Sequence, residues 1–196
     1  MSSRDAILER IRQAGRTKTE HPDVPHFNEG KKGTVADFEK ALTLMGGVWQ
    51  KPAESVSIED NVRTLFPEGS KFCSVVPEVK SDYDLSEFKT PADLEPVDVG
   101  VVRARYAVAE TGSLWISEDE FKINTLGYFP QYLVALLDPE DIVYNLHEMY
   151  ARPDFHEVNY CVLMTGPSAT ADIQGVLIHG AQGVRSLTVI PCPKPE

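Results

Sequence analysis

Several segments of this chain are apolar at nearly every position rather than at every second position, and this pattern predicts the fold class. The clearest runs are Lys71–Val76, Val97–Val102, Tyr132–Leu137, Val158–Met164 and Leu187–Ile190. Strands of a parallel sheet have this pattern because helices bury both of its faces. Two further runs, Tyr106–Ala109 and Ser113–Ile116, follow one another without a helix, which implies some antiparallel pairing. We therefore expect a three-layer α/β/α domain with a mixed, mostly parallel sheet.

Hydroxyl residues followed three positions later by an aspartate mark the starts of three expected helices. The pairs are Ser2 with Asp5, Thr34 with Asp37, and Ser57 with Asp60. Each hydroxyl can accept a hydrogen bond from the first helical turn, and apolar residues follow at helical spacing. A fourth helix is expected to begin at Asp138-Pro139, to carry apolar residues from 142 to 150, and to stop before Pro153.

The first helix is set apart from the others in the sequence. Its apolar residues are Ile7, Leu8, Ile11 and Ala14, and Gly15 is expected to end it. Residues 15–33 mix basic residues, two histidines, two prolines and glycine without periodicity, which is typical of a linker. We expect an N-terminal helix and linker arm over residues 1–33, which packs on the body or on another subunit, and one α/β domain over residues 34–196. The arm also allows a homo-oligomer.

Composition narrows the function classes. The 196 residues carry a formal net charge of −11, which disfavours a nucleic-acid partner because phosphates require a basic surface. No apolar run is long enough for a membrane span, and no apolar signal core opens the chain, so a cytoplasmic location is expected. The dinucleotide fingerprint GxGxxG and the phosphate-binding GxxxxGK[ST] are both absent, which makes independent NAD or ATP chemistry unexpected.

The cysteines and histidines do not form a recognisable metal motif. Cys73, Cys161 and Cys192 lie far apart in the sequence, and Cys73 and Cys161 fall inside apolar runs typical of core thiols. An iron–sulfur cluster requires about four converging thiolates, so this chain is not expected to bind one. No histidine pair has zinc-ligand spacing, and we predict no metal.

A glycine turn with three hydroxyls is the first candidate binding site. Thr165-Gly166-Pro167-Ser168-Ala169-Thr170 follows a buried run, and we expect a short helix after it and then a second glycine turn that carries His179. Backbone N–H groups at a helix start can hold an anion, so a small carboxylate or phosphate is the expected ligand. The candidate contacts are Gly166, Pro167, Ser168 and Thr170. The alternative is a plain strand-to-helix turn, with Ser168 as its N-cap and Asp172 stabilising the helix start.

A second glycine turn, Glu110-Thr111-Gly112-Ser113, lies between two apolar runs. Glu110 could act as a general base, a nucleophile or a group that orients the ligand, and Thr111, Gly112 and Ser113 could contact the ligand. The alternative is a hairpin turn in which Glu110 points to water.

Two further side chains complete the set of candidate site residues. His179 could serve as an acid–base group, since histidine titrates near working pH, or it could cap a strand turn. Arg105 could pair with a substrate carboxylate because it is close to Glu110 in the sequence, although such arginines are more often surface residues.

Three segments in order resemble the lactate utilization protein C family, the LUD-domain proteins. Ser3–Arg12 resembles the family's N-terminal helix, Ala109–Leu114 resembles its "A-E-T-G-[ST]-L", and Thr165–Ile173 resembles its "T-G-P-S-x-T-A-D-I". The resemblance implies a fold similar to the glucosamine-6-phosphate deaminase, ribose-5-phosphate isomerase and CoA-transferase group. It also implies a role in oxidising L-lactate to pyruvate beside two iron–sulfur proteins, with the clusters held by those partners.

The chain departs from the family pattern at two loops. The family usually continues to "H-G-P", whereas this chain has His179-Gly180-Ala181-Gln182-Gly183, and the family's histidine after the proline of the central strand is missing after Pro130. Two other functions stay open: a stand-alone enzyme acting on a small phosphorylated or CoA-linked acid, and a non-catalytic assembly module. In each enzymatic or binding case, the segments around residues 110 and 168 are expected to meet in one polar cleft at the edge of the sheet.

Overall fold

The computed structural model describes residues 2–14, 20, 22–25, 27 and 30–195 of the chain. The expected end of the first helix at Gly15, and much of the expected linker, lie outside these residues. The division into an arm over residues 1–33 and a domain over residues 34–196 therefore stays a prediction. None of the helices within the described ranges has the length and apolar character needed to cross a membrane.

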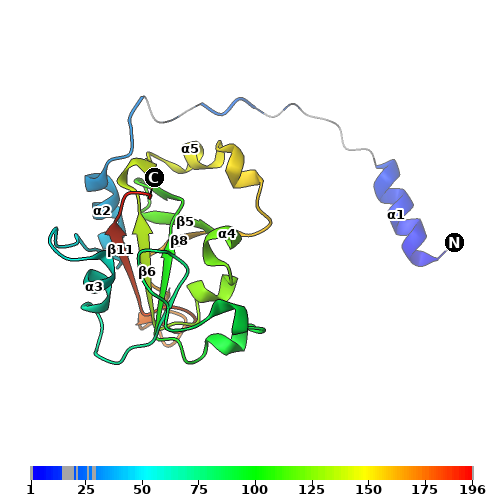
Figure 1. Cartoon of the computed structure of the whole chain (residues 1–196). Coiled ribbons are helices and arrows are strands. Elements are labelled where there is room, and N and C mark those ends of the chain that lie inside the picture. Colours follow the sequence, from blue (N-terminus) through cyan, green and yellow to red (C-terminus); the bar gives the residue numbers. More distant parts are fainter. Residues whose placement is uncertain (1, 15–19, 21, 26, 28–29, 196) are drawn as a thin grey trace.

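A five-stranded parallel sheet forms the centre of the fold (Figure 1). Its order is β1 (Val48–Trp49), β11 (Ser186–Pro191), β6 (Tyr132–Leu137), β3 (Val99–Arg103) and β2 (Phe72–Ser74). The central strand β6 pairs with β11 along its whole length and with β3 on its other side. Except for the two-residue β1, these strands coincide with apolar runs of the sequence. The predicted mixed α/β fold with a mostly parallel central sheet is thus confirmed, and its likeness to the deaminase and CoA-transferase group stays a prediction.

The antiparallel pairing is gathered in a second sheet of four strands. Its order is β7 (Ile142–Val143), β4 (Tyr106–Val108), β5 (Ser113–Ser117) and β8 (Cys161–Thr165). Strand β5 is antiparallel to both β4 and β8, and β7 is parallel to β4. The chain passes from one sheet to the other within two residues, because Ala104 N–H donates to Leu136 O and Arg105 N–H donates to Trp115 O.

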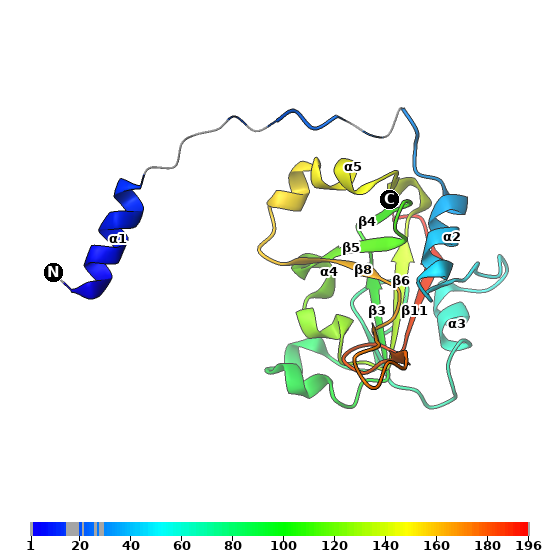
Figure 2. The same cartoon turned by 180° about the vertical axis from the view of Figure 1, so that it is seen from behind.

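Helices and the second sheet cover the central sheet. Helices α2 (Val35–Leu44) and α3 (Ile58–Arg63) begin after Thr34 and Ser57, whose hydroxyls accept the predicted N–H bonds from the first turn. Helix α3 buries Val62 on one face of the parallel sheet, while α2 buries Phe38 and Leu42 in the core between the two sheets. Helix α5 (Leu146–Tyr150) lies over the outer face of the second sheet (Figure 2). Its Met149 belongs to the same buried cluster as the fully buried Trp115.

Short helical elements fill the connections. They are α4 (Glu118–Phe121), η1 (Leu85–Glu87), η2 (Pro91–Leu94), η3 (Asn124–Gly127), η4 (Pro139–Asp141) and η5 (Pro153–His156). Residues 80–96 are acidic and contain Pro91 and Pro96, which predicts a surface loop. The segment nevertheless contributes the fully buried Leu94 to the main core.

The prediction of a helix that starts at Asp138-Pro139 is wrong for the first half of that helix. The chain forms the single turn η4 and then β7, and α5 begins only after Asn145, whose side chain accepts from Glu148 N–H. Ile142 and Val143 pair with Ala107 and Val108 of β4, so sheet pairing overrides the helical spacing. The end of the helix before Pro153 is as predicted.

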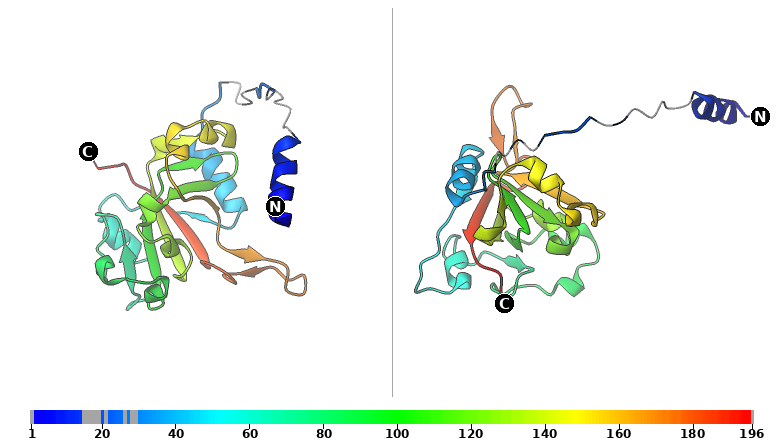
Figure 3. Two further views of the ribbon diagram at one scale, coloured as in Figure 1. Left: turned by 90° about the vertical axis from the view of Figure 1, so that its right-hand side faces the viewer. Right: turned by 90° about the horizontal axis from the view of Figure 1, so that it is seen from above.

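The prediction of a short helix after Ser168 is also wrong. This segment is an antiparallel hairpin of β9 (Ala169–Thr170) and β10 (Ile178–His179) that projects from the body (Figure 3). Gln174 and Gly175 both have positive φ angles and form its tight turn, in which Val176 N–H donates to Ile173 O. Asp172 is therefore part of the hairpin, and no helix start exists there for it to stabilise.

Helix α1 (Ser3–Gln13) has the predicted Ser2–Asp5 capping box but buries none of its residues. It lies away from the α/β body, as Figures 1 and 3 show. Ile7 and Ile11 are 56% and 65% exposed.

Two glycine turns pack directly against the backbone of α2. Gly112 has a φ of 68°, and a Cβ there would overlap Leu42 N; Gly166 has a φ of 69°, and a Cβ there would overlap Met45 O. Only glycine allows both the left-handed conformation and this close approach. The turns around residues 110 and 166 are therefore held on one helix, and this contact positions the candidate site.

We expect Gly112→Ala to lower the free energy of unfolding by about 3 kcal/mol, because the methyl group adds overlap with α2 to the cost of positive φ. Gly69→Ala is the matched control, since Gly69 has a φ of 86° with no atom within 4 Å of an added Cβ. The control should lose only about 1 kcal/mol. Urea unfolding of both variants measures the difference. Equal losses would contradict the close contact with α2.

The Cys73 thiol should be unreactive in the folded protein. Burial raises its pKa to about 11, so near neutral pH it is protonated and is a poor nucleophile. We expect iodoacetamide to label Cys73 only after unfolding and the half-buried Cys161 to react sooner. Mass spectrometry of the two peptides measures both rates. Rapid labelling of Cys73 in the native chain would contradict its position in the core.

Candidate functional site

Three hydroxyls join the turn around residue 110 to the end of β8. Thr111 Oγ1 lies 2.7 Å from Ser113 Oγ, which lies 2.5 Å from Thr165 Oγ1. The antiparallel register of β5 and β8 places Ser113 opposite Thr165, and Ser113 is buried. Two hydrogen bonds use two of the three O–H donors, so one of the three hydroxyls keeps a donor for a ligand. The structure thus brings together two of the segments predicted to form the site.

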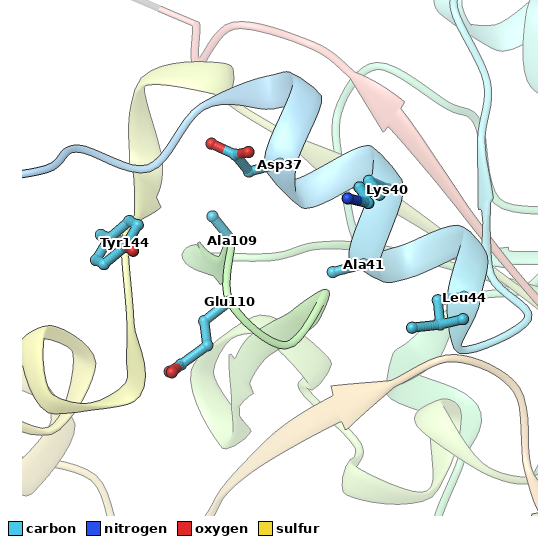
Figure 4. Close-up of a pocket in the computed structure, with 7 residues that line it drawn as sticks. All are labelled: Asp37, Lys40, Ala41, Leu44, Ala109, Glu110 and Tyr144. Carbon is cyan, nitrogen blue, oxygen red and sulfur yellow. The ribbon is translucent and has the colours of Figure 1, made fainter.

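A groove runs between α2 and this turn, and we call it the Glu110 groove. It consists of two pockets, of about 310 and 460 Å³, that share Ala41, Leu44 and Glu110. The first pocket is further lined by Asp37, Lys40, Ala109 and Tyr144 (Figure 4). The second is further lined by Met45, Thr111, Ser113, Leu146, Leu163 and Thr165. The groove therefore has apolar walls and a small number of polar groups, as small-molecule sites usually have.

Three charged side chains line this groove: Asp37, Lys40 and Glu110 (Figure 4). Lys40 is the one basic side chain among the described residues that line it. No ion pair joins the three side chains in the part of the chain that the structure describes. The Lys40 ammonium is therefore available to an anionic ligand, although two carboxylates lie in the same groove.

Glu110 has a structural role as well as a place in the groove. Its N–H donates to Tyr144 O at 3.0 Å, and its Oε2 accepts from Leu146 N–H at 3.2 Å. The residue therefore ties the turn to the start of α5, yet its side chain is exposed. Both readings of the sequence are compatible with this geometry, and a catalytic role for Glu110 stays a prediction.

The glycine turn at 166–168 faces a different pocket. This pocket has a volume of about 240 Å³ and shares only Thr165 with the Glu110 groove; its other lining residues are Gly127, Tyr128, Met164, Gly166, Pro167, Ser168, Gln182, Gly183 and Val184. The expected single cleft is thus two neighbouring pockets that meet at Thr165. Ser168 N–H donates to Val184 O and Ser168 O accepts from Gly180 N–H, so no helix begins there. The predicted helix start and the N-cap role of Ser168 are therefore wrong, while anion binding by this turn stays a prediction without a helix to support it.

Thr170 and His179 lie on the projecting hairpin and line neither pocket. The Thr170 hydroxyl donates to Asp172 Oδ2 at 3.2 Å. His179 is exposed, and its ring lies beside Gly46, where a Cβ would come within 4.0 Å of Cε1. An acid–base role for His179 stays a prediction.

The structure does not place Arg105 beside Glu110, so its predicted pairing with a substrate carboxylate stays a prediction that the geometry does not support. Arg105 lies at the opposite end of the β4–β5 hairpin from Glu110, because the strands between them separate the two positions. Its Nε donates to Glu120 Oε1 at 2.7 Å and its Nη2 to Asp119 Oδ2 at 3.3 Å. These carboxylates already neutralise the guanidinium.

Lys40 and Thr165 are groove residues that the sequence reading did not select. Thr165 is the first residue of the glycine-turn motif, so the motif could have identified it as a site residue. Lys40 is an exposed helix residue with no motif around it, and only the packing of Gly112 against α2 places it beside Glu110.

Comparison with known proteins agrees with this architecture. The LUD domain family model matches residues 84–190, which is more than half of the chain. An uncharacterized protein of Neisseria meningitidis serogroup B is 30% identical over 97 residues, which are 48% of this chain and 42% of that protein. The match therefore spans less than half the length of this curated relative.

A solved structure is also similar. The crystal structure of a DUF162 family protein from Deinococcus radiodurans has a TM-score of 0.58 and 14% identity, and the match covers 80% of this chain and 94% of that one. At this identity the likeness concerns the fold alone. Together with the match over residues 84–190, these findings show that the chain belongs to the LUD domain family, which is associated with lactate utilization.

Proposed function

We propose that this chain is a subunit or accessory protein of an iron–sulfur-dependent system that oxidises L-lactate to pyruvate, and that its Glu110 groove binds a small carboxylate. Membership of the LUD domain family supports the metabolic context. The observation that carries the binding proposal is that Lys40, which has no ion pair among the described residues, lines one pocket of this groove, while the three-hydroxyl chain lines the adjoining pocket.

The charges of the groove favour a carboxylate over a phosphate. One carboxylate group carries a single negative charge, which Lys40 can balance, and it can accept a hydrogen bond from the one free O–H of the three-hydroxyl chain. A phosphate group carries more negative charge and would face Asp37 and Glu110 with the same single cation. The proposal therefore ranks a small carboxylate above the phosphorylated or CoA-linked acids.

Glu110 adds a second element of specificity in this proposal. Its carboxylate is acceptor-only when ionised, so it can accept a hydrogen bond from the 2-hydroxyl of lactate. Pyruvate has a carbonyl at this position and offers no such donor. The groove is thus expected to bind lactate more tightly than pyruvate, with the apolar Ala41 and Leu163 beside the methyl group.

The iron–sulfur clusters of such a system are proposed to lie in partner proteins. Cys73 and Cys161 belong to different sheets, and Cys192 follows β11 of the first sheet. This separation supports the proposal that the clusters lie in partner proteins, since a cluster requires about four converging thiolates. This chain is proposed to contribute carboxylate binding, and its partners the redox centres.

We expect Lys40→Gln to weaken lactate binding about tenfold or more, since a charge-assisted hydrogen bond is lost. Calorimetric or NMR titration with lactate measures the affinity. Lys51→Gln removes the same charge from an exposed lysine that does not line the groove, and it should bind lactate like the wild type. Equal affinities for the two variants, or no lactate binding by the wild type, would overturn the binding proposal.

The metabolic role has a separate test in cells. A strain without this chain is expected to grow poorly on L-lactate as sole carbon source and normally on glucose. The wild-type chain should restore growth on lactate and, as a tagged protein, should co-purify with iron–sulfur proteins. Normal growth of the deletion strain on lactate would contradict the role, whatever the groove binds.

A further inference from the structure

Helix α1 has an apolar stripe that no other part of the described chain covers. The stripe consists of Ile7, Leu8 and Ile11, which recur at helical spacing and are 56%, 36% and 65% exposed. An isolated helix of eleven residues is marginally stable in water, even with a good capping box such as that of Ser2 and Asp5. The stripe therefore requires a surface to pack on, and the α/β body of the same chain does not provide it in this structure.

The Glu110 groove has an apolar rim of matching character. Leu44 and Met45, at the end of α2, are 85% and 49% exposed, and Leu146 and Leu163 line the same pocket. An amphipathic helix commonly binds by laying residues at i, i+3 or i+4 and i+7 into an apolar groove. Arg4, Ile7 and Leu8, and Ile11 of α1 have this spacing.

Charge complementarity favours the pairing of these two surfaces. Residues 1–33 hold seven basic and five acidic residues, whereas residues 34–196 hold twelve basic and twenty-five acidic ones. Arg4 continues the stripe toward the N-terminus, and the groove carries two carboxylates, those of Asp37 and Glu110, against the single ammonium of Lys40. Opposite charges at the two surfaces steer their association and fix its direction.

The arm joins the body beside the groove. The Phe27 ring packs on His147, one residue after the groove residue Leu146, with ring centroids 5.2 Å apart. Gly33 lies so close to β7 that a Cβ there would come within 2.6 Å of Ile142 O. An arm that leaves at the rim of one groove can reach a second groove that faces it, which is the geometry of a two-fold symmetric contact.

We propose that α1 docks its apolar stripe into the Glu110 groove of a second copy of this chain, and that the two copies exchange their arms. The arm of each copy then covers the groove of the other copy. The contact depends on the apolar rim and on the charges of the groove, and it stands whether or not the groove binds lactate.

Light scattering of the full chain after size exclusion tests the assembly. The wild type should be a dimer, and Ile11→Asp should weaken dimerisation about tenfold or more, since it places a charge in the apolar contact. Ala6→Asp is the matched control, because it adds the same charge on the opposite face of α1 and should remain dimeric. Circular dichroism confirms that each variant keeps its fold.

The groove side has its own pair of variants. Leu44→Asp should also give monomers, while Val56→Asp, which changes a 41% exposed valine outside the groove, should not. Mixing chains that carry Ile11→Cys with chains that carry Leu44→Cys should yield a disulfide between the two. A monomeric wild type overturns the proposal, and so does a dimer that tolerates both Ile11→Asp and Leu44→Asp. These readouts are masses and cross-links, so they fail independently of lactate binding.

Discussion

The site depends on the contact of two glycine turns with the backbone of α2. A side chain at Gly112 or Gly166 would overlap the helix, so both turns can approach it only because they lack a Cβ. The approach holds the hydroxyls of Thr111, Ser113 and Thr165 and the carboxylate of Glu110 against one wall of the groove. It also gives a physical reason for the glycines in both resembling motifs, since each closes a turn onto the same helix.

Among the described residues, this groove combines one basic side chain, two carboxylates and a chain of three hydroxyls with one free O–H donor. This composition matters more than the size of the groove, because it sets which charge a ligand can bring into it. In the proposed binding, a singly charged acid pairs with Lys40, whereas a ligand with more negative charge would be repelled by Asp37 and Glu110. The neighbouring pocket at Ser168 has no such set of charges among its lining residues and therefore plays no part in the proposed binding.

Much of the fold can be predicted from the sequence, because buried parallel strands and capped helices leave local patterns. The run Tyr132–Leu137 coincides with β6, and the hydroxyls of Thr34 and Ser57 begin α2 and α3 as predicted. The errors have tertiary causes. Ile142 and Val143 pair with β4, and Ser168 pairs with Val184, so neither segment is free to form a helix. Arg105 is close to Glu110 in sequence, but the hairpin strands separate them, and Lys40 enters the site only through the packing of α2.

The segment that the family model matches lacks several elements that complete the fold. The match over residues 84–190 contains most strands of both sheets but omits α2, β1 and β2. Strands β1 and β2 are the two outer strands of the parallel sheet, so a fragment with those limits would expose fresh hydrogen-bonding edges on both sides. It would also leave the turns of Gly112 and Gly166 facing water in place of a helix. The structure of the matched segment therefore depends on contacts with the residues that precede it.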